Sequence, residues 1–186
     1  MNFYKELSYV NASVESRLKH ANLVLNDLQL FPKLIDILFM VDDKTSTRAA
    51  WVLEFVCKDY IFAIVPYLDI FTEQIKNLKL DASIRPASKV CALIAETYYD
   101  KQPNVLKKIL NSKHKELIIE ASFDCLIHDE KVAAKAYAMN MLFLFGKDHT
   151  WIHPELAQIL EQDFQNQSPG FKARAKHILK KIKASS

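Results

Sequence analysis

The sequence predicts an all-α protein in which pairs of helices repeat along the chain and stack into an α-α superhelix. The chain has 186 residues but only two glycines, Gly146 and Gly170. Sheet proteins use glycine at hairpin turns and bulges, where φ is positive, so two glycines cannot serve many hairpins. Apolar residues make up 50% of the chain, which is enough for a sizeable core. Two recurring motifs, one proline-led and one rich in small residues, indicate the helix pairs.

The first helix of each pair is marked by a Pro-x-Leu-x-x-apolar opening. It occurs as PKLIDI from Pro32, PYLDIF from Pro66 and PELAQI from Pro154, and a weaker copy without proline begins at Lys115. Proline suits the first turn of a helix, because the N–H that it lacks has no partner there. We therefore expect first helices to begin near residues 32, 66, 115 and 154. The segment QPNVLKKILN, between the second and third of these, predicts an extra short helix.

The second helix of each pair begins with small residues. The openings are RAAWVLEF from Arg48, RPASKVCA from Arg85, AAKAYAMN from Ala133 and KARAKHIL from Lys172. Alanine and serine at these positions let the helix backbone pack closely against its partner. In the second pair, Leu68, Phe71, Ile75 and Leu78 also follow the spacing of one helix face.

An N-terminal helix precedes the array, with Asn11 or Ser13 as its cap. Its apolar stripe is expected to comprise Val14, Leu18, Ala21, Leu25 and Leu28. Its polar face carries Glu15, Arg17, Lys19 and His20, as expected of a capping helix. The sequence predicts one domain over residues 1–186, with capping helices over 1–29 and repeats over 30–184.

These features together resemble the HEAT/armadillo class of helical repeat. The resemblance rests on the early proline, an acidic turn at Asp42-Asp43 or Asp81, and arginine at the start of the second helix. It implies a ladder of ion pairs, Asp42 or Asp43 with Arg48 and Asp81 with Arg85, that ties repeats together. The chain also resembles short proteins of Bacteroidetes bacteria that sometimes carry the label adenylosuccinate lyase. The loop typical of that enzyme family, a serine pair followed by Met-Pro-x-Lys, is absent from this sequence.

The cysteines and the hydropathy pattern favour a cytoplasmic protein. Cys57, Cys91 and Cys125 are an odd number of widely spaced residues within apolar runs, which indicates core positions in a reducing compartment. The N-terminal segment lacks the apolar stretch of a signal peptide, and no run approaches the ~18 apolar residues of a membrane span. We therefore expect no membrane association.

No catalytic or metal-binding motif stands above background. The shortage of glycine excludes phosphate loops, dinucleotide fingerprints and serine nucleophile elbows. His149 and His153 have the spacing of one helix face, but Pro154 places a turn between them, and His128-Asp129-Glu130 lacks the cysteines of zinc deaminases. Trp51 and Trp151 are expected to pack in the core. The sequence thus predicts no catalytic residue, no cofactor and no metal ion.

Charge is distributed unevenly along the chain. Residues 169–186 hold six basic residues and no acidic one, and the rest holds the other 19 of the 25 basic residues with all 22 acidic residues. In the last helix, Phe171, Ala175, Ile178 and Ile182 form the expected buried stripe. The cations around it indicate a solubilising end cap or a contact for an acidic partner or nucleic acid.

The function that these patterns favour is a non-catalytic protein–protein interaction module. Helical-repeat proteins commonly bind a protein or peptide on the surface formed by their second helices. Here that surface is expected to include Arg48, Glu54, Arg85, Lys89, Lys135 and Lys176. The alternative is a nucleic-acid-binding protein related in fold to the HEAT-like DNA alkylation-repair glycosylases, and a third possibility is an enzyme of an unrecognised type.

Overall fold

The fold class is confirmed: the protein is all-α. The computed structural model describes residues 2–128, 131–162 and 164–185, and within them there are eleven α-helices, four 3-10 helices and no strand. No residue in these ranges, glycine included, has a positive φ. The connections between helices are therefore built without the left-handed backbone conformation.

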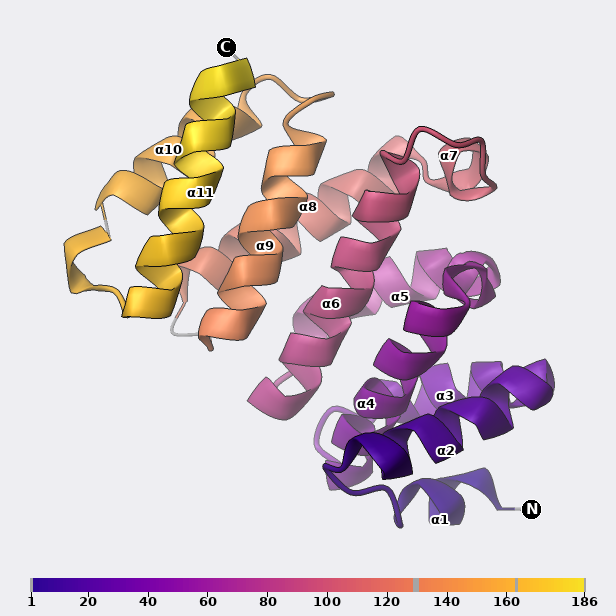
Figure 1. Ribbon diagram of the computed structural model, residues 1–186. Coiled ribbons are helices and arrows are strands. Elements are labelled where there is room, and N and C mark those ends of the chain that lie inside the picture. Colours follow the sequence, from indigo (N-terminus) through magenta and orange to yellow (C-terminus); the bar gives the residue numbers. More distant parts are fainter. Residues whose placement is uncertain (1, 129–130, 163, 186) are drawn as a thin grey trace.

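The helices form two layers (Figure 1). One layer, the second-helix layer, consists of α4 (Lys44–Asp59), α6 (Asp81–Tyr98), α9 (Val132–Phe145) and α11 (Pro169–Ser185). The other, the first-helix layer, consists of α3 (Phe31–Leu38), α5 (Leu68–Gln74), α8 (Ser112–Ile127) and α10 (Ile152–Gln162). Within the second-helix layer each helix packs against the next along the chain, and α2 (Val14–Asn26) continues the row beside α4. The chain is therefore compatible with a helical-repeat fold.

The helix starts follow from local capping. Ser13 caps α2 by accepting a hydrogen bond from the backbone N–H of Ser16 at 3.1 Å, and Asp43 caps α4 by accepting from that of Thr45 at 2.7 Å. At α8, Asn111 and His114 form a reciprocal capping box. Of the two caps predicted for the N-terminal helix, Ser13 is correct, because Asn11 accepts from the backbone of Ser13 instead.

The first helices begin near the predicted positions, but proline does not always occupy the first turn as expected. Pro32 is the second residue of α3 and Pro154 the third residue of α10. Pro66 instead lies inside a 3-10 helix, Ile61–Tyr67, and α5 starts only at Leu68. The predicted apolar face of this segment, Leu68, Phe71, Ile75 and Leu78, is buried. However, α5 ends at Gln74 and continues as a 3-10 turn, Ile75–Asn77, called η3. The predicted extra helix exists as α7 (Leu106–Ile109).

The predicted face of the N-terminal helix α2 is wrong. Val14, Leu18 and Leu28 of the expected stripe are 66%, 47% and 47% exposed, and the residues that α2 buries are His20, Ala21 and Val24. The buried face is therefore rotated by about 70° from the predicted one. A second short helix, α1 (Phe3–Leu7), lies beside it and buries Phe3 and Leu7.

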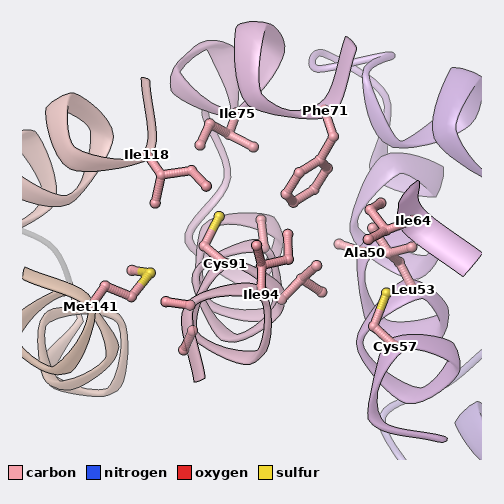
Figure 2. Close-up of a cluster of buried hydrophobic side chains, with 14 of the residues drawn as sticks. Ala50, Leu53, Cys57, Ile64, Phe71, Ile75, Cys91, Ile94, Ile118 and Met141 are labelled. Carbon is pink, nitrogen blue, oxygen red and sulfur yellow. The ribbon is translucent and has the colours of Figure 1, made fainter. Parts of the chain in front are cut away.

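One continuous core runs between the layers (Figure 2). All three cysteines are buried in it and none forms a disulfide bond, as expected of small core residues. The predicted stripe of the last helix is buried too. Over the described part of the chain, no helix is long and apolar enough to cross a membrane.

Candidate interaction surface

The six surface residues predicted from the sequence all lie on the second-helix layer, but two of them are not surface residues. They are Arg48 and Glu54 on α4, Arg85 and Lys89 on α6, Lys135 on α9 and Lys176 on α11. Lys176 is exposed, whereas Arg48, Arg85 and Lys89 are half-buried. Glu54 and Lys135 are only 3% and 5% exposed, so their placement on the surface is wrong. A buried charge needs a partner: Glu54 pairs with two cations, and Lys135 lies over the ring of Phe171.

Glu54 pairs with two cations, Lys58 of its own helix and Arg85 of α6, and the second pair connects α4 to α6. Its Oε2 accepts a hydrogen bond from Arg85 Nη2 at 2.8 Å, and its Oε1 lies 3.1 Å from Lys58 Nζ. Because the carboxylate is buried and both cations reach solvent, Glu54 holds Arg85 in place at the surface. This arrangement explains why a buried acid is tolerated on α4.

Arg17 of α2 is a third cation beside this carboxylate. Its guanidinium lies over the Trp51 ring, 4.6 Å from the ring centroid. Burial, and next the neighbouring Arg85, lowers the pKa of Arg17, and Glu54 offsets part of that shift. Its Nε is buried without a hydrogen-bond partner among the described residues. Sequence analysis placed Arg17 on the outer face of the capping helix, so the rotation of α2 is what brings it to this cluster.

Two other cations of the layer lie over aromatic rings of the next helix. Lys89 of α6 lies over Tyr137 of α9 at 5.1 Å, and Lys135 of α9 lies over Phe171 of α11 at 5.9 Å. Such contacts are attractive and orient the ammonium groups. The ammonium groups also cover one face of each ring, so that another ring cannot stack on that face.

The two layers differ in charge. Helix α11 has six basic residues and no acidic one, α9 has a single charged residue, Lys135, and α4 has three basic residues against two acidic ones. In the first-helix layer, α5 and α10 each have two acidic residues and no basic one, and α8 has three acidic against two basic residues. The second-helix layer is thus the basic side of the molecule.

The ion-pair ladder implied by the family resemblance does not form as expected. Asp42 pairs with Lys79 at 2.7 Å, and Asp81 lies 3.5 Å from Lys131. Asp43 is engaged as a helix cap and accepts a hydrogen bond from Tyr4 at 2.5 Å. Within the described ranges, neither Arg48 nor Arg85 forms a direct ion pair with a turn acid, although the pKa of Asp43, lowered most by the hydrogen bond from Tyr4, is lowered further by the charge of Arg48. The repeats are nevertheless linked by charge, because Lys79 and Arg85 each reach back to the preceding pair.

The two tryptophans differ from the prediction of core packing. Trp51 is half-buried, and its Nε1–H donates to the backbone carbonyl of Ala82 at 3.0 Å. Trp151 is 55% exposed and stacks on Phe123 with a centroid distance of 5.7 Å. Neither ring is a core residue.

His149 and His153 do not lie together on one helix. His153 lies within α10, contrary to the expectation that Pro154 would end the helical conformation there, and its Nε2–H donates to the carbonyl of Phe143 at 2.9 Å. Gly146 permits this contact, because a Cβ at that position would lie 2.0 Å from the imidazole. His149 precedes the helix. No group of three His, Cys, Asp or Glu side chains suited to a metal occurs in the described ranges. Asp129 and Glu130 of the His128-Asp129-Glu130 motif lie outside them.

A polar network that the sequence analysis missed joins α6, α8 and the turn after α9. Lys115 donates to Tyr98 Oη at 2.7 Å and lies 3.0 Å from Asp148, which also accepts from Tyr99 Oη at 2.7 Å. Burial opposes ionisation of Asp148, but the hydrogen bonds from Tyr99 and Lys115 outweigh it and lower the pKa of Asp148. Nothing in the spacing of these four residues along the chain indicates that they meet.

Comparisons with protein-family models, with curated proteins and with solved structures find no match to this chain.

Proposed function

We propose that the protein is a HEAT-like interaction module that binds an acidic segment of another protein along its second-helix layer. The observation that carries the proposal is the separation of charge between the layers. Cations gather on α11 and around Glu54, where Arg17, Lys58 and Arg85 lie. A basic surface attracts acidic partners and accelerates their association.

The anchoring of these cations supports a protein partner. Arginine and tryptophan dominate binding energy at many protein interfaces when they are held rigidly in partly buried positions. Arg17, Trp51 and Arg85 have this character, because Glu54 and the backbone of Ala82 hold two of them in place. A carboxylate of the partner would meet guanidinium groups that have already lost much of their freedom.

The capture of partners from an extract of the native host tests the proposal. The informative variant is the triple substitution Arg174→Glu, Lys180→Glu and Lys183→Glu, which reverses charge at three exposed sites on α11. The matched control is Lys33→Glu, Lys101→Glu and Lys108→Glu, which makes the same change at exposed sites outside the layer. We expect the wild type and the control variant to retain acidic proteins that the α11 variant does not retain. Equal retention by all three, or no partner above background, would refute the proposal.

Nucleic-acid binding is the second candidate, and the six cations of α11 favour it. Against it, Arg17 and Lys89 cover the partly exposed rings of Trp51 and Tyr137, on which bases would stack. A titration with duplex DNA at several salt concentrations separates the two. Phosphate contacts would give an affinity that falls steeply with salt, and the acidic-protein proposal expects only weak, nonspecific binding.

We also propose that the protein is located in the cytoplasm. Three buried cysteines that form no disulfide support a reducing compartment.

A further inference from the structure

A pocket of about 200 Å³ lies between the second and third helix pairs. Its walls come from η3, α6, α8 and α9, and so from both layers. Figure 2 shows Ile75, Cys91, Ile118 and Met141 arranged around one space, and all four line the pocket. None of the six predicted surface residues contributes to it.

The pocket exists because the first-helix layer is incomplete at this point. α5 ends at Gln74, whereas α8 continues to Ile127, so in the first-helix layer the second helix pair presents the turn η3 and Leu78, not a longer α5, to the second half of α8. The helices that surround this gap present small side chains to it, among them Ala87 of α6, Ala121 of α8 and Ala138 of α9. Small residues on three helices leave a space that larger ones would fill.

The interior is apolar and its polar groups are satisfied. Ser122 Oγ donates to the carbonyl of Ile118 at 2.6 Å. Burial raises the pKa of the Cys91 thiol to about 12, so this side chain is uncharged at neutral pH. No buried polar atom of the lining lacks a partner among the described residues. The pocket is partly open to solvent, and for comparison an enclosed apolar cavity of about 150 Å³ in another protein stays dry and binds benzene.

The mouth carries charges of both signs. Lys76 lies 3.5 Å from Glu120, and Asp124 lines the opening beside His128, whose ring Nδ1 lies 2.8 Å from the Asp124 backbone carbonyl. A charged ligand would gain no uniform attraction here and would lose its hydration on entry.

We propose that this pocket binds an uncharged apolar molecule about the size of one or two fused aromatic rings. By the size of cavities that hold benzene, about 200 Å³ accommodates roughly seven to nine non-hydrogen atoms. Ligands this small bind with dissociation constants on the order of 0.1–1 mM. The site is independent of the proposed protein-binding surface.

Indole, which is uncharged, is a suitable probe, with benzoate and benzylamine as charged molecules of similar size. With the methionine methyl groups ¹³C-labelled, indole is expected to shift the Met141 signal saturably and leave that of Met40 unchanged. Met40 lies between α3 and α4 and does not line the pocket. The charged probes are expected to bind at least about tenfold more weakly, because they must be dehydrated.

The substitution Ala121→Leu fills the pocket, and Ala173→Leu makes the same change at an exposed site on α11. We expect Ala121→Leu to weaken indole binding at least about tenfold and Ala173→Leu to leave it unchanged. Should Ala121→Leu fail to fold, the wild-type comparison of Met141 with Met40 decides alone. No saturable shift at Met141, equal binding of the charged probes, or full binding by a folded Ala121→Leu variant would each overturn the proposal.

Discussion

At the scale of single residues, Trp51 compensates for a defect in a neighbouring helix. Pro86 lies inside α6 and has no N–H to donate to the carbonyl of Ala82, four residues earlier. The indole Nε1–H of Trp51 on α4 donates to that carbonyl instead. The proline and the tryptophan, far apart in sequence, are therefore parts of one hydrogen-bond arrangement between adjacent repeats.

This compensation predicts that the two positions are energetically coupled. Trp51→Phe is expected to lower the free energy of unfolding by about 0.5–1.5 kcal/mol, because it removes the hydrogen bond to the Ala82 carbonyl. In a Pro86→Ala background the new N–H of residue 86 can take over, so the same substitution should cost about 1 kcal/mol less. Urea unfolding of the two single variants and the double variant measures the difference. Strict additivity would contradict the coupling.

The Asp148 network predicts how stability depends on pH. The pKa of Asp148 is lowered in the folded protein, so its contribution is complete above the unfolded-state value of about 3.9 and is lost as pH falls through the folded pKa. The side chain is 40% exposed, so solvent screening limits the effect to about 0.5 kcal/mol. Asp148→Asn should therefore reduce the loss of stability between pH 6 and pH 3 by that amount, as measured by urea unfolding. Asp59→Asn, at an exposed site without an ion pair, is the control and should not.

At the scale of helices, α2 shows where pattern alone misleads. Its apolar stripe is regular, yet the helix buries His20 and turns Leu18 outward. The buried His20 ring donates from Nδ1 to the Ser16 carbonyl at 2.6 Å, while its Nε2 lies 3.5 Å from Glu6 of α1 and makes no hydrogen bond among the described residues. The rotation also carries Arg17 onto Trp51. Contacts with α1 and α4 therefore override the helix's own periodicity.

The rotation of α2 predicts an unusual ranking of two truncations. Val24→Ala should cost about 1–2 kcal/mol, because Val24 is fully buried. Leu18→Ala removes more atoms but should cost less than about 0.5 kcal/mol, because Leu18 is 47% exposed. Urea unfolding of the two variants gives the comparison. A larger loss of stability for Leu18→Ala than for Val24→Ala would contradict the rotation and support the orientation of α2 predicted from its apolar stripe.

Features that depend on local sequence patterns could be predicted from the sequence, whereas features that depend on contacts between helices could not. The helical class, the second helices and the burial of Leu68 and Phe71 follow from local patterns, since spacing and small residues act within one element. The burial of Glu54 depends on Arg85, 31 residues away, and the early end of α5 is not marked by any breaker residue. The six predicted residues therefore lie on the second helices, as the local patterns indicate, but the contacts that hold Arg17 and Arg85 are contacts between helices.

At the scale of the whole molecule, charge differs between the two layers, whereas the packing contacts run along the row of helices. The basic surface lies across one layer, whereas stability depends on contacts between neighbours along the array. α6 packs between α4 and α9 in the middle of the chain, and its buried residues Val90, Ala92 and Ala95 are almost inaccessible to solvent. α1 and α11 each lack a neighbour on one side.

An array whose elements contact only their neighbours should open from its ends, which gives the last prediction. Amide hydrogen exchange should be slowest in α6, at least about tenfold slower than in α1 and in the last turn of α11. Of these three segments, only α6 must separate from a neighbour on each side before its hydrogen bonds open. Hydrogen exchange read by mass spectrometry on wild-type protein measures this gradient, and equal protection in all three segments would mean that the chain unfolds as one cooperative unit. Ala92→Gly should accelerate exchange throughout the array, because it weakens the central helix by about 1 kcal/mol. Ala184→Gly, the same change in the last helix, should accelerate it only near the C-terminus.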